Sequence, residues 1–321
     1  MTRKSVIGMI RASALAAAFF LAAGALPFLG VLLMLFVPAP IVSYVVGRPA
    51  AILRMALSLG LSLVLVALAA GLTVAAGYAV TFGVATATIC VMLEQEQPFE
   101  LIVVVATVAV MVAGTLSLLA IAGSPQALVT MAHDTLADGF TRSANFYQTL
   151  GMGSGIDAGS RERLVSATVS LLPAIAALSA AFMVTINLLC FWRWFGKGRL
   201  TYSLFGDLAL WHTPEWLIWI LLATGFGLFA PVAPIKTLAI DGFICTAAIY
   251  FCQGLAIIAY YFRMLAMPMA VRGIALLMLC FAAVQPVLAI LVCTIGIFDM
   301  WVDFRRLKPP GREAGSFGDF S

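Results

Sequence analysis

The side chains best suited to hold a ligand lie in residues 235–262, an apolar stretch long enough to cross a bilayer. At about 100° per residue, Thr246, Gln253 and Tyr260 share one face of a helix, and Asp241 lies beside that face. An ionisable side chain in a spanning helix is costly and therefore marks a candidate functional site. We consider two interpretations: a ligand or ion pocket with Asp241 at its edge, or helix packing through side-chain hydrogen bonds.

Two further polar groups complete the candidate set. Asn187 lies inside another apolar run and is an additional pocket candidate, although a single amide in a membrane helix more often joins helices. Asp299 and Asp303 are spaced i and i+4, and Arg305 follows them, so they form a terminal charged cluster. This cluster could hold the tail or contact a partner, or it could be an ion-paired helix end.

Small residues recur every fourth position near the amino terminus, at Ala14, Ala18 and Ala22. Small side chains at this spacing let another membrane helix approach closely. They are therefore candidate docking residues for a membrane protein partner, although the whole stretch is rich in alanine.

Few residues suggest catalysis. Asp134 and Asp138, spaced i and i+4, could hold Mg²⁺ with a phosphorylated lipid, but such sites use further charged groups and only Arg142 is near. The sequence has no Gly-rich phosphate loop, zinc-protease helix or nucleophile elbow, and its six cysteines form no Cys-x-x-Cys pair. We therefore expect no enzyme activity, no metal and no cofactor, with an intramembrane enzyme as the least favoured alternative.

The composition determines which elements must position these residues. Hydrophobic residues make up 63% and charged residues 10% of the chain, and the mean hydropathy is +1.10. A soluble domain is about a quarter charged, so this chain has too few polar residues for a soluble surface. The long uncharged runs predict an all-α, polytopic transmembrane helical bundle in the lipid bilayer. The net charge of +4 fits the positive-inside bias, and no basic cluster with aromatics indicates nucleic-acid binding.

The breaks between apolar runs predict about eight spanning helices, within a range of seven to nine. Prolines divide residues 12–47 into a first helix and a segment at 27–46 that either spans the membrane or re-enters it. The side of the membrane on which the carboxyl terminus lies depends on which of the two is correct. We expect a single last span over residues 274–299. A signal-peptide-like amino terminus is interpreted as a retained first helix, because apolar sequence continues beyond it.

The polar segments are expected outside the bilayer core. Residues 124–147 have the periodicity of a surface amphipathic helix, starting with the cap pair Ser124-Pro125. Tryptophans and basic residues at 193–213 predict an interfacial connector, and Thr213-Pro214-Glu215 is expected to start the next helix. We assign residues 1–304 to one membrane domain and residues 305–321 to a disordered basic tail.

Three carboxyl-terminal stretches resemble the YybS-like family of uncharacterised bacterial multipass membrane proteins. They are the aromatic run into Pro214-Glu215-Trp216, the segment Phe251-Cys252-Gln253-Gly254-Leu255-Ala256, and Gly296-Ile297-Phe298-Asp299 continuing to Asp303-Phe304-Arg305. The family is distantly similar to the substrate-binding components of energy-coupling-factor transporters and to the cell-shape protein MreD. In the former an Ala-rich first helix docks on the coupling subunit, and Ala14, Ala18 and Ala22 would be the matching positions.

The resemblance implies a protein of the bacterial inner (cytoplasmic) membrane without catalytic residues. The chain has no vitamin-binding motif that would identify a substrate. The leading expectation is a small-ligand-binding or transporter-component protein with its pocket near Gln253. The alternative is a membrane scaffold or assembly factor of an envelope complex, which would hold a protein partner rather than a small-molecule ligand.

Overall fold

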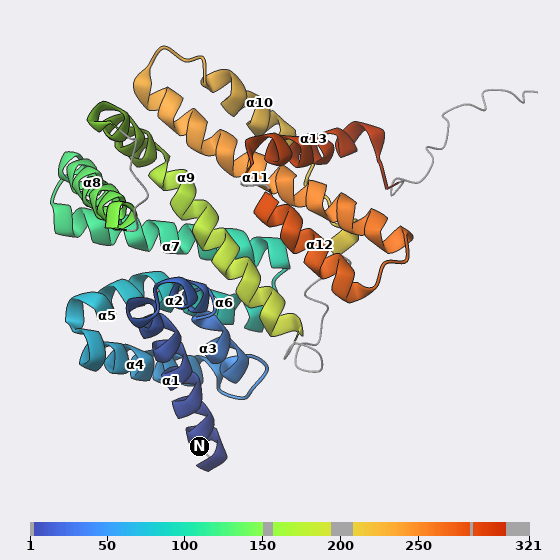
Figure 1. Ribbon diagram of the computed structural model, residues 1–321. Coiled ribbons are helices and arrows are strands. Elements are labelled where there is room, and N and C mark those ends of the chain that lie inside the picture. Colours follow the sequence, from blue (N-terminus) through green and yellow to red (C-terminus); the bar gives the residue numbers. More distant parts are fainter. Residues whose placement is uncertain (1–2, 150–156, 194–207, 283–284, 306–321) are drawn as a thin grey trace, which may run out of the picture. The chain divides into compact units, whose positions relative to one another are not determined.

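The computed structural model describes residues 3–149, 157–193, 208–282 and 285–305. Within these residues the chain is helical and contains no strand, which confirms the all-α membrane prediction (Figure 1). The chain forms two compact units, Met1–Phe205 and Gly206–Ser321, and the single membrane domain over residues 1–304 stays a prediction. Each unit is described by itself.

The first unit carries most of the long helices. They are α1 (Arg3–Ala25), α2 (Pro27–Met34), α3 (Pro38–Val45), α4 (Ala51–Ala70), α5 (Leu72–Tyr78), the π-helical turn η1 (Ala79–Gly83), α6 (Val84–Glu94), α7 (Phe99–Ala122), α8 (Pro125–Thr149) and α9 (Ala158–Phe191). The breaks fall where local chemistry requires them. Pro27 lacks the N–H needed to continue α1, and Gly71, at φ +90°, ends α4. The predicted cap of α8 is present, because Ser124 Oγ accepts from Ala127 N at 3.1 Å.

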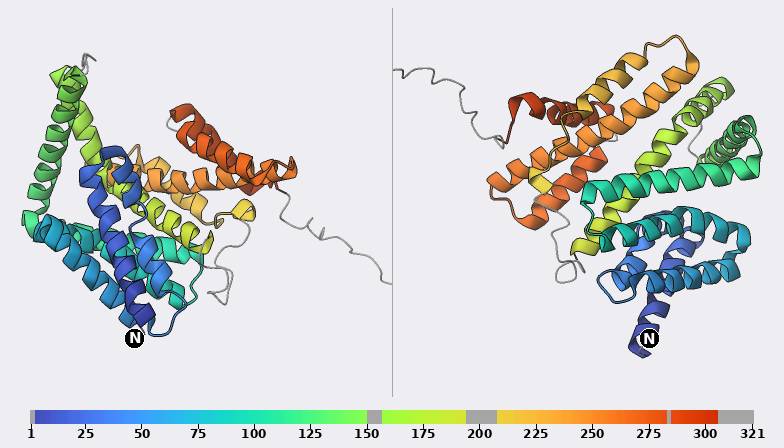
Figure 2. Two further views of the ribbon diagram at one scale, coloured as in Figure 1. Left: turned by 60° about the horizontal axis from the view of Figure 1, so that its bottom comes forward. Right: turned by 180° about the vertical axis from the view of Figure 1, so that it is seen from behind.

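The second unit consists of η3 (Leu208–Leu210), α10 (Leu217–Gly227), α11 (Ala233–Met264), α12 (Met269–Ala282) and α13 (Pro286–Val302). Helices α10 and α13 both pack against the long helix α11, as two further views show (Figure 2). The predicted single span over 274–299 is wrong. Pro286 has no N–H to donate to an earlier carbonyl, so the chain leaves α12 and starts α13 there.

Six helices in the described part of the chain are long and apolar enough to cross a membrane. They are Ser5–Ala25, Ala51–Ala70, Leu72–Glu94, Phe99–Ala122, Gly159–Phe191 and Pro234–Met264, and shorter apolar helices cover Leu29–Val45, Leu217–Gly227 and Pro286–Val302. A 17-residue helix reaches only about 25 Å of the roughly 30 Å needed. The expected eight crossings therefore depend on how these shorter helices sit in the bilayer, and that count stays a prediction.

Candidate functional site

The candidate site begins with a very close crossing of α11 and α13. A Cβ atom on Gly254 would lie 2.1 Å from the carbonyl oxygen of Val292, and one on Gly296 would lie 2.0 Å from that of Tyr250. Only glycine fits at both positions, so each helix presses its backbone against the other. This contact brings the polar side chains next to the glycines within hydrogen-bonding range across the two helices.

Gln253, the leading pocket candidate, is 2% exposed and uses its amide within the chain. Its Nε2 donates to Asp299 Oδ2 at 3.1 Å. Its Oε1 accepts from the backbone N of Thr213 at 3.2 Å and from the Thr213 hydroxyl. One Nε2 hydrogen then remains without an acceptor among the described residues.

Asp299 is the centre of this arrangement. Besides Gln253, its Oδ2 accepts from Arg305 Nη2 at 2.7 Å, and its Oδ1 accepts from the backbone N of Phe304 at 3.0 Å. The side chains of Asp299 and Arg305 are 5% and 1% exposed, so the ion pair is shielded from solvent. Asp303, at φ +44°, turns the chain after α13 and thereby carries Arg305 back to the carboxylate.

Arg305 also fixes the segment that precedes α10. Its Nη1 donates to the carbonyl oxygens of Ala209 at 2.9 Å and of Trp211 at 2.8 Å. We call Thr213, Gln253, Asp299 and Arg305 the clasp, because together they join α11, the end of α13 and residues 209–213. Arg305 was expected to open the disordered tail, whereas the structure buries it in the clasp.

Two tyrosines that sequence reasoning did not select support the clasp. The hydroxyl of Tyr261 donates to the Phe304 carbonyl at 2.9 Å, and that of Tyr250 donates to Met300 Sδ at 3.4 Å. The predicted Tyr260 is half-buried, and its ring packs edge-on against Tyr261. Tyr261, and not the predicted Tyr260, therefore contacts the chain that follows α13. Helical periodicity alone did not distinguish these two positions.

The rest of the predicted polar face of α11 packs against its own helix or against α10. The buried Thr246 hydroxyl donates to the carbonyls of Gly242 at 2.8 Å and Phe243 at 3.1 Å on its own helix. A Cβ on Gly242 would lie 2.7 Å from Thr224 Cγ2 of α10, so α10 covers this part of the face. Asp241 is half-buried beside it.

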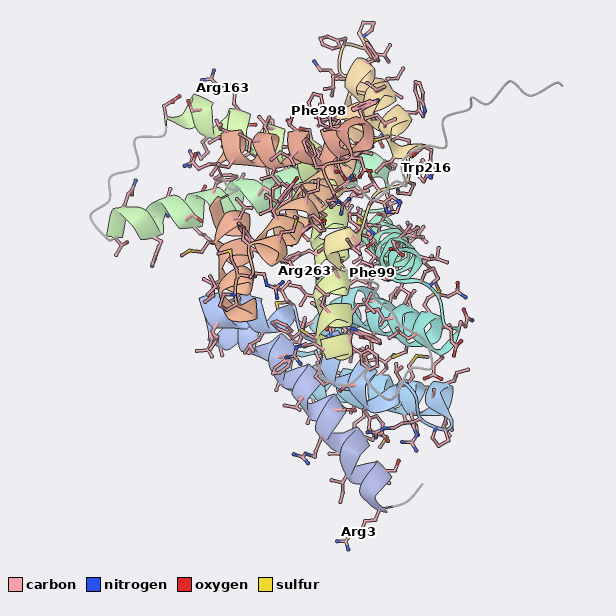
Figure 3. The ribbon with its side chains drawn as sticks, turned by 90° about the vertical axis from the view of Figure 1, so that its right-hand side faces the viewer. Arg3, Phe99, Arg163, Trp216, Arg263 and Phe298 are labelled. Carbon is pink, nitrogen blue, oxygen red and sulfur yellow. The ribbon has the colours of Figure 1, made fainter. Side chains whose placement is uncertain are left out.

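Thr213 makes a tertiary contact instead of the helix cap that the sequence predicted. It was predicted to cap the next helix, but α10 begins at Leu217, and Trp216 occupies its N-cap position without a side-chain cap bond. Thr213 instead bonds to Gln253. Trp216 and Phe298 are 60% and 52% exposed, and Figure 3 shows both side chains directed away from the packed interior.

The remaining predicted groups lie in the first unit. Asn187 is fully buried in α9, and its Nδ2 donates to the carbonyls of Leu35 at 2.6 Å and Met183 at 2.7 Å. Leu35 lies between α2 and α3, where Pro38 interrupts the helix. Asn187 therefore binds a carbonyl that the break leaves without a helical partner.

The predicted docking residues of α1 divide between two environments. Ala14 and Ala18 are exposed, while Ala22 is half-buried and its carbonyl lies close to Gly30 of α2. The buried face of α1 is a different one, made by Ala12, Ser13, Ala16 and Ala17. In that face Ser13 Oγ donates to the Ser58 carbonyl of α4 at 3.0 Å. One small-residue face of α1 is thus used inside the unit, and another faces outward.

The two aspartates considered for metal binding lie on α8. Asp134 and Asp138 border a shallow, open surface depression, and among the described residues no three His, Cys, Asp or Glu side chains come together. His133 Nε2 lies 2.9 Å from Glu162 Oε1 of α9. This hydrogen bond raises the pKa of His133, so the imidazolium form favours the contact between α8 and α9.

Chemically, the clasp is a polar network whose members mainly bind one another, although Arg305 Nε and one Gln253 N–H have no partner among the described residues. The charges of Asp299 and Arg305 neutralise each other, and the network holds no Ser, Cys or His nucleophile beside a base. Its members come from all three stretches that carry the family resemblance. Thr213 and Gln253 are 40 residues apart in sequence, and Gln253 and Asp299 are 46 apart. Their meeting at one place is the main finding that sequence reasoning missed.

Comparison with known proteins identifies one family. Residues 14–300 match a family model described as "Predicted membrane protein (DUF2232)", so the match covers most of both units and all of the clasp except Arg305. No curated protein and no solved structure matches the chain.

Proposed function

We propose, on the premise that the chain belongs to the DUF2232 family of predicted membrane proteins, that it is a non-enzymatic scaffold or assembly component of a membrane complex. The membrane we propose is the bacterial inner membrane. The role fits a multipass helical protein whose clasp residues mainly bind one another.

The observation that carries this proposal is that the clasp residues direct most of their hydrogen-bonding groups at one another. Gln253 uses its carbonyl oxygen twice and one N–H once inside the chain, and the carboxylate of Asp299 accepts three donors. A ligand pocket would instead present such groups to an open space. The clasp therefore favours fixing the end of α13 over capturing a small molecule.

The outward face of α1 supports the same role. Ala14 and Ala18 are exposed beside Ile7, which is 48% exposed. Small side chains let a partner helix come near enough for close packing, which drives helix association in a bilayer. We propose this face as the position of a membrane protein partner.

The test is quantitative recovery of a partner from native membranes after cross-linking. Replacing Ala14 and Ala18 with leucine would hold a partner helix away, and we expect recovery to fall at least about tenfold, which corresponds to about 1.4 kcal/mol of association energy. The matched control is Ala69→Leu on an exposed position of α4. Recovery of the wild-type chain alone, or equal recovery in all variants, would refute the proposed scaffold.

A second candidate function, ligand binding or transport, is favoured by Asp241. This carboxylate lies within the candidate span Pro234–Met264, and such residues commonly face substrate or ion pathways. The protein would then be a small-ligand-binding transporter component. Any ATP-driven step would come from a partner.

Asp241→Asn separates the two functions because Asp241 is not part of the clasp. The transport hypothesis predicts that a ligand from a panel of small polar solutes stabilises the wild type and that Asp241→Asn abolishes this effect. Gln253→Ala should abolish it too, and a clasp variant that spares Gln253, Arg305→Met, reveals how much of that loss comes from opening the clasp. Unchanged ligand binding in Asp241→Asn and Gln253→Ala would exclude the pocket.

A further inference from the structure

Two arginines converge on one tyrosine at the connector between α3 and α4. The guanidinium carbon of Arg48 lies 5.3 Å from the ring centroid of Tyr44, and that of Arg54 lies 5.6 Å from it. Arg54 Nη1 also donates to the Tyr44 hydroxyl at 3.4 Å. Tyr44 is only 5% exposed, so it is a fixed platform for both cations.

The backbone of the connector between α3 and α4 positions Arg48 beside the Tyr44 ring. Gly47 and Ala50 have φ values of +70° and +58°, and the second is an uncommon conformation for a residue with a side chain. The N–H of Gly47 donates to Glu94 Oε1 at 2.8 Å, which ties the turn to the end of α6. Arg54 Nε donates to the Pro49 carbonyl at 2.8 Å, which closes the turn from the other side.

The carboxylate of Glu94 lies at this turn, but the two arginines together carry twice its charge. Among the residues that the structure describes, neither Arg48 nor Arg54 has an acidic group within ion-pair distance. Glu94 is the acidic group tied to this turn, and it uses Oε1 for the backbone of Gly47. The single charge of Glu94 offsets only one of the two positive charges, so an anion bound beside the two guanidinium groups would be stabilised.

The position of the pair identifies the kind of anion. Helix α4, a candidate span, begins at Ala51, so the connector lies where a membrane helix meets the headgroups. The Tyr44 hydroxyl donates to the Ser5 carbonyl near the start of α1 at 2.9 Å, which brings the N-terminal turn to the same level. Arg3 extends from that turn away from the unit (Figure 3).

We propose that Arg48 and Arg54, held by Tyr44, form a binding site for the phosphate of an anionic phospholipid headgroup. The planar guanidinium of Arg48 can donate two parallel hydrogen bonds to phosphate oxygens, and Arg54, whose Nε and Nη1 bond Pro49 and Tyr44, can add a further one from Nη2. Tyr44 keeps both groups at the level of the headgroups, and lipid supplies the missing negative charge. This site belongs to the first unit and does not depend on the proposed scaffold function.

The experiment measures lipid binding by the full chain in phosphatidylcholine nanodiscs containing increasing fractions of phosphatidylglycerol. The readout is the rise in melting temperature with the anionic fraction, confirmed by counting retained lipids in native mass spectra. Losing charge-assisted hydrogen bonds to phosphate should weaken binding about tenfold in Arg48→Gln and in Arg54→Gln. Arg142→Gln on α8 removes the same charge elsewhere and should bind as the wild type does.

Arg48→Gln is the decisive variant because its fold should survive. Arg48 makes no hydrogen bond to another described residue, so in pure phosphatidylcholine the variant should lose only the cation–π contact with Tyr44, and each lipid titration is compared with that variant's own melting temperature there. Arg48→Lys keeps the charge but loses the planar fork and should show a smaller loss. Indistinguishable lipid titrations for Arg48→Gln and Arg142→Gln would overturn the proposal.

Inorganic phosphate added to protein in pure phosphatidylcholine distinguishes the source of the phosphate group. If the site takes lipid, millimolar phosphate should change the melting temperature little and compete weakly with phosphatidylglycerol. Equal stabilisation by inorganic phosphate, lost in Arg48→Gln, would overturn the lipid assignment in favour of a soluble phosphate compound.

Discussion

Replacing Asp299 with leucine should destabilise the second unit more than any other single change in the clasp. The substitution removes the acceptor of Gln253 Nε2, Arg305 Nη2 and the Phe304 N–H at once. It also leaves the guanidinium of Arg305 positively charged with its side chain 1% exposed. Breaking a buried ion pair by removing one partner costs about 3–5 kcal/mol, and we expect a loss in this range.

The double variant Asp299→Leu, Arg305→Met gives the internal check. Removing both charges removes the cost of the uncompensated cation, and the remaining loss is that of unsatisfied donors such as Phe304 N–H, about 1–3 kcal/mol. The double variant should therefore be more stable than Asp299→Leu alone. If the two sites acted independently, the double variant would instead be less stable than Asp299→Leu alone.

The assay is reversible unfolding of the purified chain in mixed detergent micelles, followed by tryptophan fluorescence. Thr294→Val on an exposed position of α13 is the control, because its hydroxyl bonds only the Ile290 carbonyl of its own helix; it should change stability by less than about 0.5 kcal/mol. A loss below about 1 kcal/mol for Asp299→Leu would refute the clasp as a stabilising network. Additive losses in the double variant would refute the coupling between the two charges.

Two further predictions test other contacts. Gly254→Ala should separate α11 from α13 and lower the free energy of unfolding by about 1–3 kcal/mol, because its Cβ would lie 2.1 Å from the Val292 carbonyl oxygen. Gly60→Ala has open space around it and should stabilise α4 by up to about 1 kcal/mol in the same unfolding assay. The α8–α9 contact should depend on pH, because Glu162 raises the folded-state pKa of His133. The stabilisation from this contact is complete below the unfolded-state pKa of about 6.5, and it is lost as the pH rises through the folded-state pKa. After division by the intrinsic exchange rate at each pH, the protection of the α8 amides should fall over that window in the wild type. A pH-independent difference in protection from Glu162→Gln would contradict the assignment.

The sequence was most informative where the cause of a structural feature is local. The break at Pro27 and the cap at Ser124 each depend on one residue's missing N–H or hydroxyl, and both are present. The same reasoning, applied to Pro286, would have divided the last predicted span. That residue sits inside a long apolar run, whose hydropathy concealed the break.

The clasp could not be derived in this way, because its partners are chosen by tertiary packing. Thr213 has the local features of a helix cap, yet the Gln253 carbonyl oxygen is a buried acceptor that must be satisfied. Which residue reaches Gln253 depends on the crossing of α11 and α13, and this crossing depends on Gly254 and Gly296. Glycine in a membrane helix has several uses, so its pairing with a distant glycine is not visible in one sequence.

The order of synthesis has a consequence for the clasp. Gln253 precedes Asp299 by 46 residues, and a ribosome adds about 5–20 residues per second. Gln253 is therefore synthesised about 2–9 s before its carboxylate partner exists, which is long compared with side-chain motions in a bilayer. Throughout that interval the Gln253 amide has only Thr213 as a clasp partner already synthesised. The insertion machinery, or water at the membrane surface, must shelter a polar helix face whose permanent partner arrives with the last helix.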